Sequence, residues 1–286
     1  MKEHFVDHNF GGEARDLLAR CIQVTEDYMA QGLRLTLRQL YYQLVTQNII
    51  VNKERSYKNL SRLVSRARLA GLVDWDAIED RGRPPHRSSE WDSIADLVES
   101  AVASYRLPRW EGQNKYVELW VEKDALAGVL SPLAKKHHVT LMVNKGYSSQ
   151  TAMYEASKRF IDHRSEIQSL FYIGDFDPSG EDMVRDIRDR LYTFGAAEVD
   201  VYKLALTKDQ IASYSLPPNP AKTKDPRARG FIEKHGGSSW EVDALPPNVL
   251  TLLIDNAIDK EVDKKLLLKI KKREKDDIKL LREAVA

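Results

Sequence analysis

The alternation of apolar and polar residues predicts three helices near the start of the chain. Apolar residues recur at helical spacing over residues 13–30, and a second helix is expected to begin at Thr36, a favourable N-cap. A third helix is expected to follow Ser56 and to end at Gly71. The apolar stripe of the second helix consists of Leu37, Leu40, Tyr41, Leu44 and Val45. Three helices followed by a short strand and turn, which we expect at residues 73–85, are typical of a winged-helix domain.

A second pattern, of alternating strands and helices, begins near residue 116. Strands are predicted at residues 116–121, 139–143, 170–174 and 199–206, with helices between them. This order implies a parallel sheet, so the fold class is mixed α/β. Residues 107–114 have the composition of a linker. We therefore expect a first domain over residues 1–110 and a second over residues 115–286.

The last part of the second domain is predicted to be a C-terminal helical extension. Residues 256–283 are highly charged and carry apolar residues at helical spacing, which indicates one long helix. A further helix is predicted at residues 90–105, before the linker. The long helix is expected to pack on the sheet domain, or alternatively to pair two subunits.

Three carboxylates follow directly after predicted strands. Glu122 follows the first strand, and Asp175 and Asp177 follow the third, just before a Pro-Ser-Gly turn into a helix. Ligands of open α/β sheets bind beyond the carboxyl ends of the strands, so we expect these side chains to converge there. Hard oxygen donors of this kind suit Mg²⁺ and acid–base chemistry on a phosphodiester. The alternative is that the two aspartates only cap the next helix.

Composition excludes several classes of protein. The 286 residues are 42% hydrophobic and 30% charged, as in an ordinary globular protein rather than a disordered one. Cys21 is the only cysteine, which excludes an intrachain disulfide and a cysteine-built zinc site. No apolar run reaches 18 residues, so we expect no membrane association and a cytoplasmic location.

Positive charge is concentrated in the predicted winged helix. Residues 31–73 contain eight Lys or Arg and one acidic residue, an excess of seven positive charges in a chain whose formal net charge is +1. The third helix carries much of it, on Arg55, Lys58, Arg62 and Arg66. We interpret this face as a surface for DNA phosphates; the alternative is a solvated face of a helical bundle.

A tyrosine also lies off the apolar stripe of the second helix. Tyr41 belongs to the stripe and is expected in the core, whereas Tyr42 shares the opposite face with Arg38, one turn earlier. By itself this pattern favours a surface tyrosine stacked on an arginine.

Taken together, these residues resemble a known family. Glu122 and the later Asp175-Phe176-Asp177-Pro178-Ser179-Gly180 resemble the toprim motifs, a glutamate after one strand and DxDxxG after another. Arg38-Gln39-Leu40-Tyr41-Tyr42 resembles the RxxYY helix of the topoisomerase VI A subunit and of the related meiotic double-strand-break protein. In both, a winged-helix domain precedes a toprim domain, which is a Rossmann-like parallel sheet. The resemblance spans residues 35–243, and the compact chain is most similar to stand-alone A-subunit-like proteins of bacteria and mobile elements.

The resemblance implies covalent DNA cleavage. Tyr42 is then the nucleophile that forms a 5′-phosphotyrosyl end, and Arg38 stabilises the phenolate or the phosphate charge. Glu122 binds metal or acts as a general acid or base, and Asp175 and Asp177 bind Mg²⁺. The tyrosine of one subunit works with the toprim site of the other, which implies a homodimer. The sequence has no P-loop, so strand passage would need a separate ATPase B-type subunit.

Three other functions stay open. The chain could be a hydrolytic toprim nuclease on DNA or RNA, with Tyr42 a spectator, or a non-catalytic DNA-binding partner with a vestigial metal site. The intact carboxylates weigh against the binding partner. A phosphatase that uses Asp175 as its nucleophile fits the basic helix poorly. Residues 240–247 resemble an acidic segment late in the A-subunit family, without an assigned role.

Overall fold

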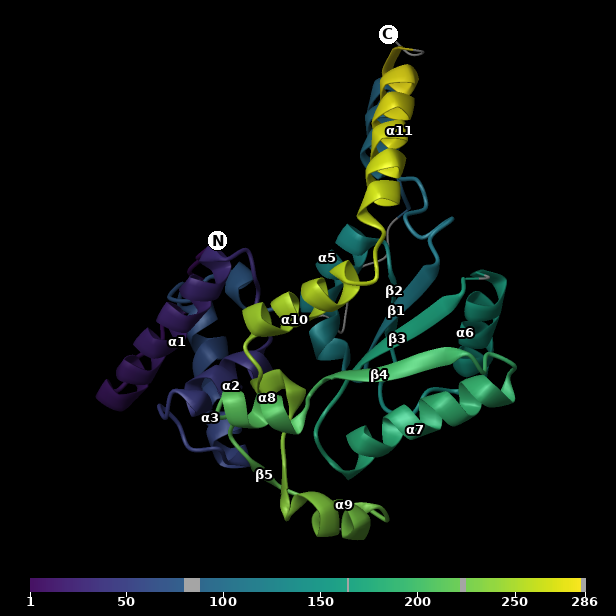
Figure 1. Cartoon of the computed structure of the whole chain (residues 1–286). Helices are drawn as coiled ribbons and strands as arrows, with labels where there is room; N and C mark the ends of the chain where they lie inside the picture. Colours follow the sequence, from purple (N-terminus) through teal and green to yellow (C-terminus); the bar gives the residue numbers. More distant parts are fainter. Residues whose placement is uncertain (80–87, 164, 222–224, 284–286) are drawn as a thin grey trace.

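The computed structural model describes residues 1–79, 88–163, 165–221 and 225–283. Within these residues the chain is mixed α/β, as predicted, with a group of helices at its start and a parallel sheet after it (Figure 1). No helix in the described ranges has the length and apolar character needed to cross a membrane.

The first three helices are confirmed. They are α1 (Gly12–Ala30), α2 (Leu37–Thr46) and α3 (Glu54–Leu69). Thr36 starts α2 as predicted: its side chain accepts a hydrogen bond from the Gln39 N–H, and the Gln39 side chain accepts one from the Thr36 N–H, a complete capping box. Buried apolar side chains hold the three helices together, because Cys21 of α1, Leu40 of α2 and Leu60 of α3 share one apolar core.

The strand predicted at residues 73–85 is wrong where the structure describes it. Trp75–Ala77 form a 3₁₀ helix, η1, because the Asp74 carboxylate accepts a hydrogen bond from the Asp76 N–H at 2.8 Å and closes a turn. Beyond it Ile78 forms only an isolated parallel bridge with Leu35. The rest of the predicted wing, residues 80–85, lies outside the described residues.

The predicted sheet is confirmed. Its strands are β1 (Lys115–Val121), β2 (Thr140–Val143), β3 (Ile167–Ile173) and β4 (Val199–Ala205). All pair in parallel, in the order β2-β1-β3-β4. Figure 1 shows α5 (Ala127–His137) and α10 (Pro247–Asp259) on one side of the sheet, and α6 (Gln150–His163) and α7 (Pro178–Thr193) on the other. Cover on both sides explains why β1 and β3 are mostly apolar and buried along most of their length.

The single C-terminal helix predicted at residues 256–283 is two helices. The chain leaves α10 at Asp259 and starts α11 (Lys264–Glu283) after Asp263, whose Oδ1 accepts hydrogen bonds from the N–H groups of Lys265 and Leu266. This aspartate caps α11 and lets it turn away from the sheet. In Figure 1, α11 projects from the body and packs along α4 (Ile94–Ser104), which begins four residues later than predicted.

The predicted linker is irregular but packed. Glu274 of α11 accepts a hydrogen bond from the Leu107 N–H at 2.8 Å and pairs with the Arg109 guanidinium at 2.7 Å. Both charged side chains are about nine-tenths buried, at 8% and 11% exposure. Trp110 is buried as well and donates to the His137 carbonyl at 2.9 Å. Residues 107–114 therefore anchor the α4–α11 arm to the sheet.

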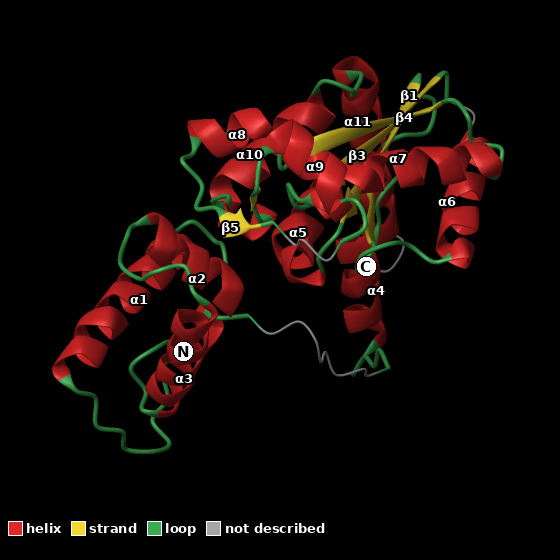
Figure 2. Ribbon diagram, turned by 90° about the horizontal axis from the view of Figure 1, so that it is seen from below, coloured by secondary structure: helices red, strands yellow, loops and turns green. Residues whose placement is uncertain are grey.

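The remaining elements of the described chain are short. They are η2 (Asp124–Leu126), α8 (Lys208–Ser213), β5 (Asn219–Pro220), α9 (Ala228–His235), β6 (Ser238–Ser239) and η3 (Val242–Ala244). Helix α2 packs against η3. Figure 2 shows α1–α3 grouped beside the sheet, with β5 next to α2.

Candidate functional site

The site is assembled where β3 ends. The Phe176 N–H donates to the Trp240 carbonyl at 2.9 Å, and the Trp240 N–H donates back at 3.0 Å, an isolated antiparallel bridge. This bridge holds the residues after Trp240 against the strand end, where the Val242 N–H donates to Asp175 Oδ1 at 3.0 Å. As a result, the acidic segment at Glu241 and Asp243 lies beside the predicted carboxylates.

The structure brings the Glu122 carboxylate into contact with the backbone of Asp175, so two of the three predicted residues lie side by side. Glu122 Oε2 accepts hydrogen bonds from the Asp175 N–H at 3.1 Å and from the Tyr172 hydroxyl at 3.3 Å. Asp175 is buried, and this burial raises the pKa of its carboxyl to about 6, although Lys123 opposes the shift. The strand ends therefore place Glu122 and Asp175 at one edge of the sheet, as predicted.

Asp177 is oriented differently. Its Oδ1 accepts hydrogen bonds from the Ser179 hydroxyl and the Gly180 N–H, both at 2.7 Å, so it is the N-cap of α7. For this residue the capping alternative describes the observed contacts. As the side chains stand, the described residues contain no group of three or more His, Cys, Asp or Glu that could hold a metal ion.

Two glycines make this close packing possible. A Cβ on Gly180 would lie 2.1 Å from the carbonyl oxygen of Asp175, which is far inside van der Waals contact. A Cβ on Gly174 would lie 2.7 Å from Glu122 Oε2 and 2.6 Å from the Tyr172 hydroxyl. The glycine of the DxDxxG motif is thus needed so that the first turn of α7 can approach the strand end.

Lys123 joins the predicted carboxylates to the acidic segment. Its ammonium lies 2.8 Å from Asp175 Oδ1, 3.0 Å from Glu241 Oε2 and 2.9 Å from Asp243 Oδ2. Burial lowers the pKa of Lys123, but the attraction of the three carboxylates outweighs it and the net pKa is raised. Lys123 is therefore a permanent cation at the centre of the site.

Arg38 reaches the same cluster from α2. Its Nε donates to Glu241 Oε2 at 2.7 Å, and its Nη2 donates to the same oxygen. Burial alone would raise the pKa of Glu241, but Arg38 and Lys123 hold it at about 2. Glu241 is thus a carboxylate shared by a cation from each half of the chain.

Tyr42 is buried, which contradicts the open helix face predicted for it. Its ring is 3% exposed, and the Asn219 amide donates to its hydroxyl at 3.2 Å. The Arg38 guanidinium lies 5.8 Å from the ring centroid. Burial raises the pKa of the Tyr42 phenol well above its usual value, and the charge of Glu241 adds to the shift. The reason for the difference is tertiary, because β5 covers the face that the α2 pattern leaves open.

Tyr41 lies in the core as predicted. It is 4% exposed, and its hydroxyl donates to Asn52 Oδ1 at 2.9 Å. The two tyrosine rings pack edge to face at 5.2 Å.

The basic face of α3 is exposed, as predicted. Arg55, Lys58, Arg62 and Arg66 all point to the surface, while Leu60, Val64 and Ala67 face inward. Lys58 pairs with Glu54 at 2.7 Å along the helix, and the Arg66 guanidinium lies over the Phe10 ring at 5.7 Å. Arg55 and Arg62 complete a row of cations along one side of α3.

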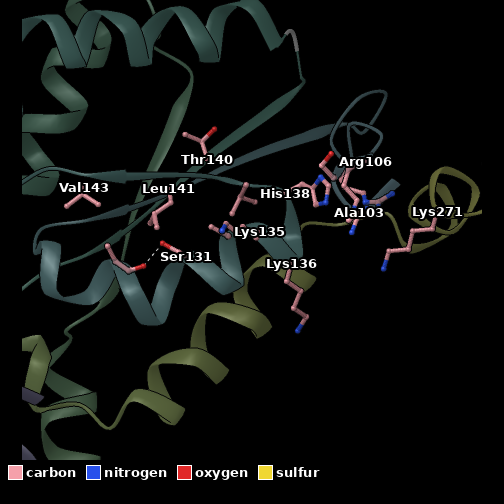
Figure 3. A pocket seen from close by; sticks show the side chains of 15 residues that line it. Ala103, Arg106, Ser131, Lys135, Lys136, His138, Thr140, Leu141, Val143 and Lys271 are labelled. Carbon is pink, nitrogen blue, oxygen red and sulfur yellow. Dashed lines mark hydrogen bonds between the residues drawn. The ribbon is translucent and has the colours of Figure 1, made fainter. Parts of the chain in front are cut away.

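Another hollow lies away from this site. It has a volume of about 1270 Å³ and is bounded by α4, α5, β2 and α11. Figure 3 shows Arg106, Lys135, Lys136 and Lys271 among the residues that line it. It includes none of the site residues predicted from the sequence. A smaller hollow of about 600 Å³ runs from Ser61 and Ser65 of α3 to Arg38 and Asp124. The first hollow has the greater volume. The second is lined by Arg38, which pairs with Glu241, so the second is the one relevant to the chemistry of the site.

Comparison with known proteins adds nothing to these contacts: no protein-family model, curated protein or solved structure matches the chain.

Sequence reasoning missed Lys123, Asn219, Glu241 and Asp243 as members of the site. A signal existed for three of them, since Lys123 follows Glu122 at a strand end and Glu241 and Asp243 repeat the i, i+2 acidic spacing. No signal in the sequence singles out Asn219.

Proposed function

We propose that the chain is a Mg²⁺-dependent DNA-cleaving enzyme of the topoisomerase VI A-subunit type, acting in the cytoplasm as a homodimer. It would consist of a winged-helix domain at residues 1–110 and a toprim domain at residues 115–286. One observation carries the proposal: a continuous set of ion pairs runs from Arg38, beside Tyr42, through Glu241 and Lys123 to Asp175. These contacts join both motifs of the resemblance into one unit, and in the proposed homodimer the tyrosine of one such unit works with the toprim carboxylates of the other.

The donor set at the strand ends fits Mg²⁺. Glu122 and Asp175 offer hard carboxylate oxygens at neighbouring strand ends, where the Asp175 N–H donates to Glu122 Oε2, and Asp177 lies two residues further on. These three residues would hold the ion, which supplies positive charge for the reacting phosphate. The burial of Asp175 strengthens this interaction, since a partly dehydrated site screens charge less than water does.

The remaining chemistry belongs to the protein's own side chains. The Tyr42 oxygen attacks phosphorus, a tyrosyl O–P bond forms, the bond from phosphorus to the 3′ oxygen breaks, and a 3′-hydroxyl leaves. The phenol proton passes to a base and the leaving oxygen takes a proton, and Glu122 is the acid–base group at the strand end. Arg38 donates to Glu241 in this structure and can stabilise the phenolate when its guanidinium turns from Glu241 to Tyr42, which lies one turn away on the same helix.

DNA would lie across the first half of the chain. The exposed cations of α3 supply phosphate contacts, and a hollow lined by Ser61 and Ser65 of the same helix extends to Arg38 at the site. Strand passage would need an ATPase B-type subunit as a partner.

The test is a cleavage assay on supercoiled DNA with Mg²⁺. Asp175→Asn should abolish cleavage and leave the fold intact. The matched control is Asp255→Asn, an acidic residue of α10 that pairs with Lys136 and His137. Full activity of Asp175→Asn would contradict the proposed metal-dependent mechanism.

A hydrolytic toprim nuclease is the second candidate, on DNA or RNA. The observation that favours it is the burial of Tyr42, whose hydroxyl is engaged by Asn219 and whose pKa is raised. In that case activity would persist in Tyr42→Phe and the cut ends would be free of protein.

A further inference from the structure

The Lys123 ammonium is surrounded by carboxylates. Oxygens of Asp175, Glu241 and Asp243 lie 2.8–3.0 Å from Nζ. They come from two separate segments, the end of β3 and the residues after Trp240, which the Phe176–Trp240 bridge holds together. Such a shell of oxygens around one positive centre is the kind of environment that proteins also build for a divalent cation.

Asp243 supplies a second and independent observation. Its side chain is fully buried, with 0% exposure, and its Oδ1 has no hydrogen-bond partner among the described residues. An unpaired oxygen on a buried carboxylate is costly, and such groups are rare unless a ligand or ion completes them. Its other oxygen, Oδ2, lies on Lys123, so this carboxylate is already aimed into the cluster.

The charges of the cluster do not balance. Three carboxylates, those of Asp175, Glu241 and Asp243, contact one shared cation, Lys123. In the described part of the chain the cations that contact these carboxylates are Lys123 and Arg38. Once Lys123 moves out, the three carboxylates and Arg38 leave two negative charges in a largely buried site, which is the charge of one divalent cation.

We propose that Asp243, with Asp175 and Glu241, forms a divalent-cation position that the Lys123 ammonium fills in this structure. Lys123 and the ion compete for the same carboxylates, so Lys123 keeps the cluster assembled when the ion is not bound. This inference rests on the proposed function, because it extends the metal site at Asp175 to residues to which the resemblance assigns no role.

The exchange needs only small movements. Mg–O distances are about 2.1 Å, so each oxygen must move inward by roughly 0.8 Å from its present distance to Nζ. The side chain of Lys123 is flexible and 22% exposed, which gives the ammonium a route out toward solvent. The present spacing around an ammonium also explains why the described side chains do not yet form a metal-sized group.

The experiment measures Mn²⁺ binding to the full chain by calorimetry and by the loss of the free Mn²⁺ electron-spin resonance signal. Lys123→Met removes the competing charge but keeps the length of the side chain. We expect it to bind Mn²⁺ at least tenfold more tightly than the unaltered protein, or to bind one additional ion. Adding Asp243→Asn to Lys123→Met should abolish that gain, and adding Asp255→Asn instead should leave it intact. Circular dichroism of each variant, with Lys123→Gln as a second neutral replacement, verifies folding.

The outcomes separate this inference from the proposed function. The inference is overturned if neither Lys123→Met nor Lys123→Gln binds Mn²⁺ more tightly, or binds more ions, than the unaltered protein does. It is also overturned if the gain survives Asp243→Asn. If the unaltered protein binds Mn²⁺ through Glu122 but Lys123→Met gains nothing, only the inference fails. If Glu122→Gln has no effect on Mn²⁺ binding while the Asp243-dependent gain is present, the inference holds and the proposed metal site at Glu122 is wrong.

Discussion

Replacing Gly180 by alanine tests whether the DxDxxG motif is a packing device. Gly180 lies in the first turn of α7, and an alanine Cβ would lie 2.1 Å from the Asp175 carbonyl oxygen. An ordinary contact begins near 3.4 Å, so the helix or the strand end must shift by more than 1 Å. That carbonyl also accepts a hydrogen bond from Lys203 Nζ at 2.7 Å, which resists the shift.

The cost follows from two opposing contributions. Forcing an extra carbon into a packed site typically costs about 1–3 kcal/mol, and a backbone atom that cannot swing aside places this clash at the upper end. Alanine recovers at most about 1 kcal/mol of helix propensity. We expect Gly180→Ala to lower the free energy of unfolding by about 2 kcal/mol, and the displaced Asp175 should reduce metal-dependent activity as well.

The assay is urea unfolding followed by circular dichroism, with Gly230→Ala as the matched control. Gly230 also lies in a helix, α9 (Ala228–His235), but outside its own helix no atom of the described residues lies within 4 Å of its added Cβ. We expect this control to be neutral or more stable by up to about 1 kcal/mol. Equal stability of the two alanine variants would refute the packing explanation of the motif.

Two further predictions concern the DNA surface and the arm. Changing Lys58, Arg62 and Arg66 together to alanine should weaken DNA binding. The slope of log K against log salt should flatten by about 2.7, for three lost phosphate contacts. Titrations at several salt concentrations measure this slope, and an unchanged slope would exclude α3 as the DNA surface. Glu274→Gln leaves the buried guanidinium of Arg109 without its counter-charge and should lower the free energy of unfolding by about 3 kcal/mol. Hydrogen exchange in α11 should then be faster, and unchanged exchange would show that this ion pair does not hold the α4–α11 arm to the sheet.

Local sequence signals predicted the elements well. Thr36 with Gln39 marks the start of α2 because a capping box needs only neighbouring residues. The strands around the site, β1 and β3, are mostly apolar because both faces of the sheet are covered. Glu122 and Asp175 follow just after these strands, where the chain leaves the covered part of the sheet. The presence of these two carboxylates at one sheet edge could therefore be predicted.

Features that depend on distant segments could not be predicted. Tyr42 is covered by Asn219, 177 residues away, and no periodicity within α2 contains that information. The 3₁₀ turn at Asp74 and the break at Asp263 each arise from one carboxylate that bonds the backbone two residues on, in competition with the regular element. Residue patterns gave Lys123 no role because its three carboxylate partners come together only in the folded chain.

The most direct test of the central claim is to trap cleaved DNA. Supercoiled DNA is incubated with Mg²⁺ and with the unaltered protein or Tyr42→Phe, the reaction is stopped with denaturant, and half of each sample receives protease before electrophoresis. The proposal predicts broken DNA that enters the gel only after protease, and none with Tyr42→Phe. Free broken ends that persist in Tyr42→Phe would contradict tyrosyl transfer and identify a hydrolytic nuclease.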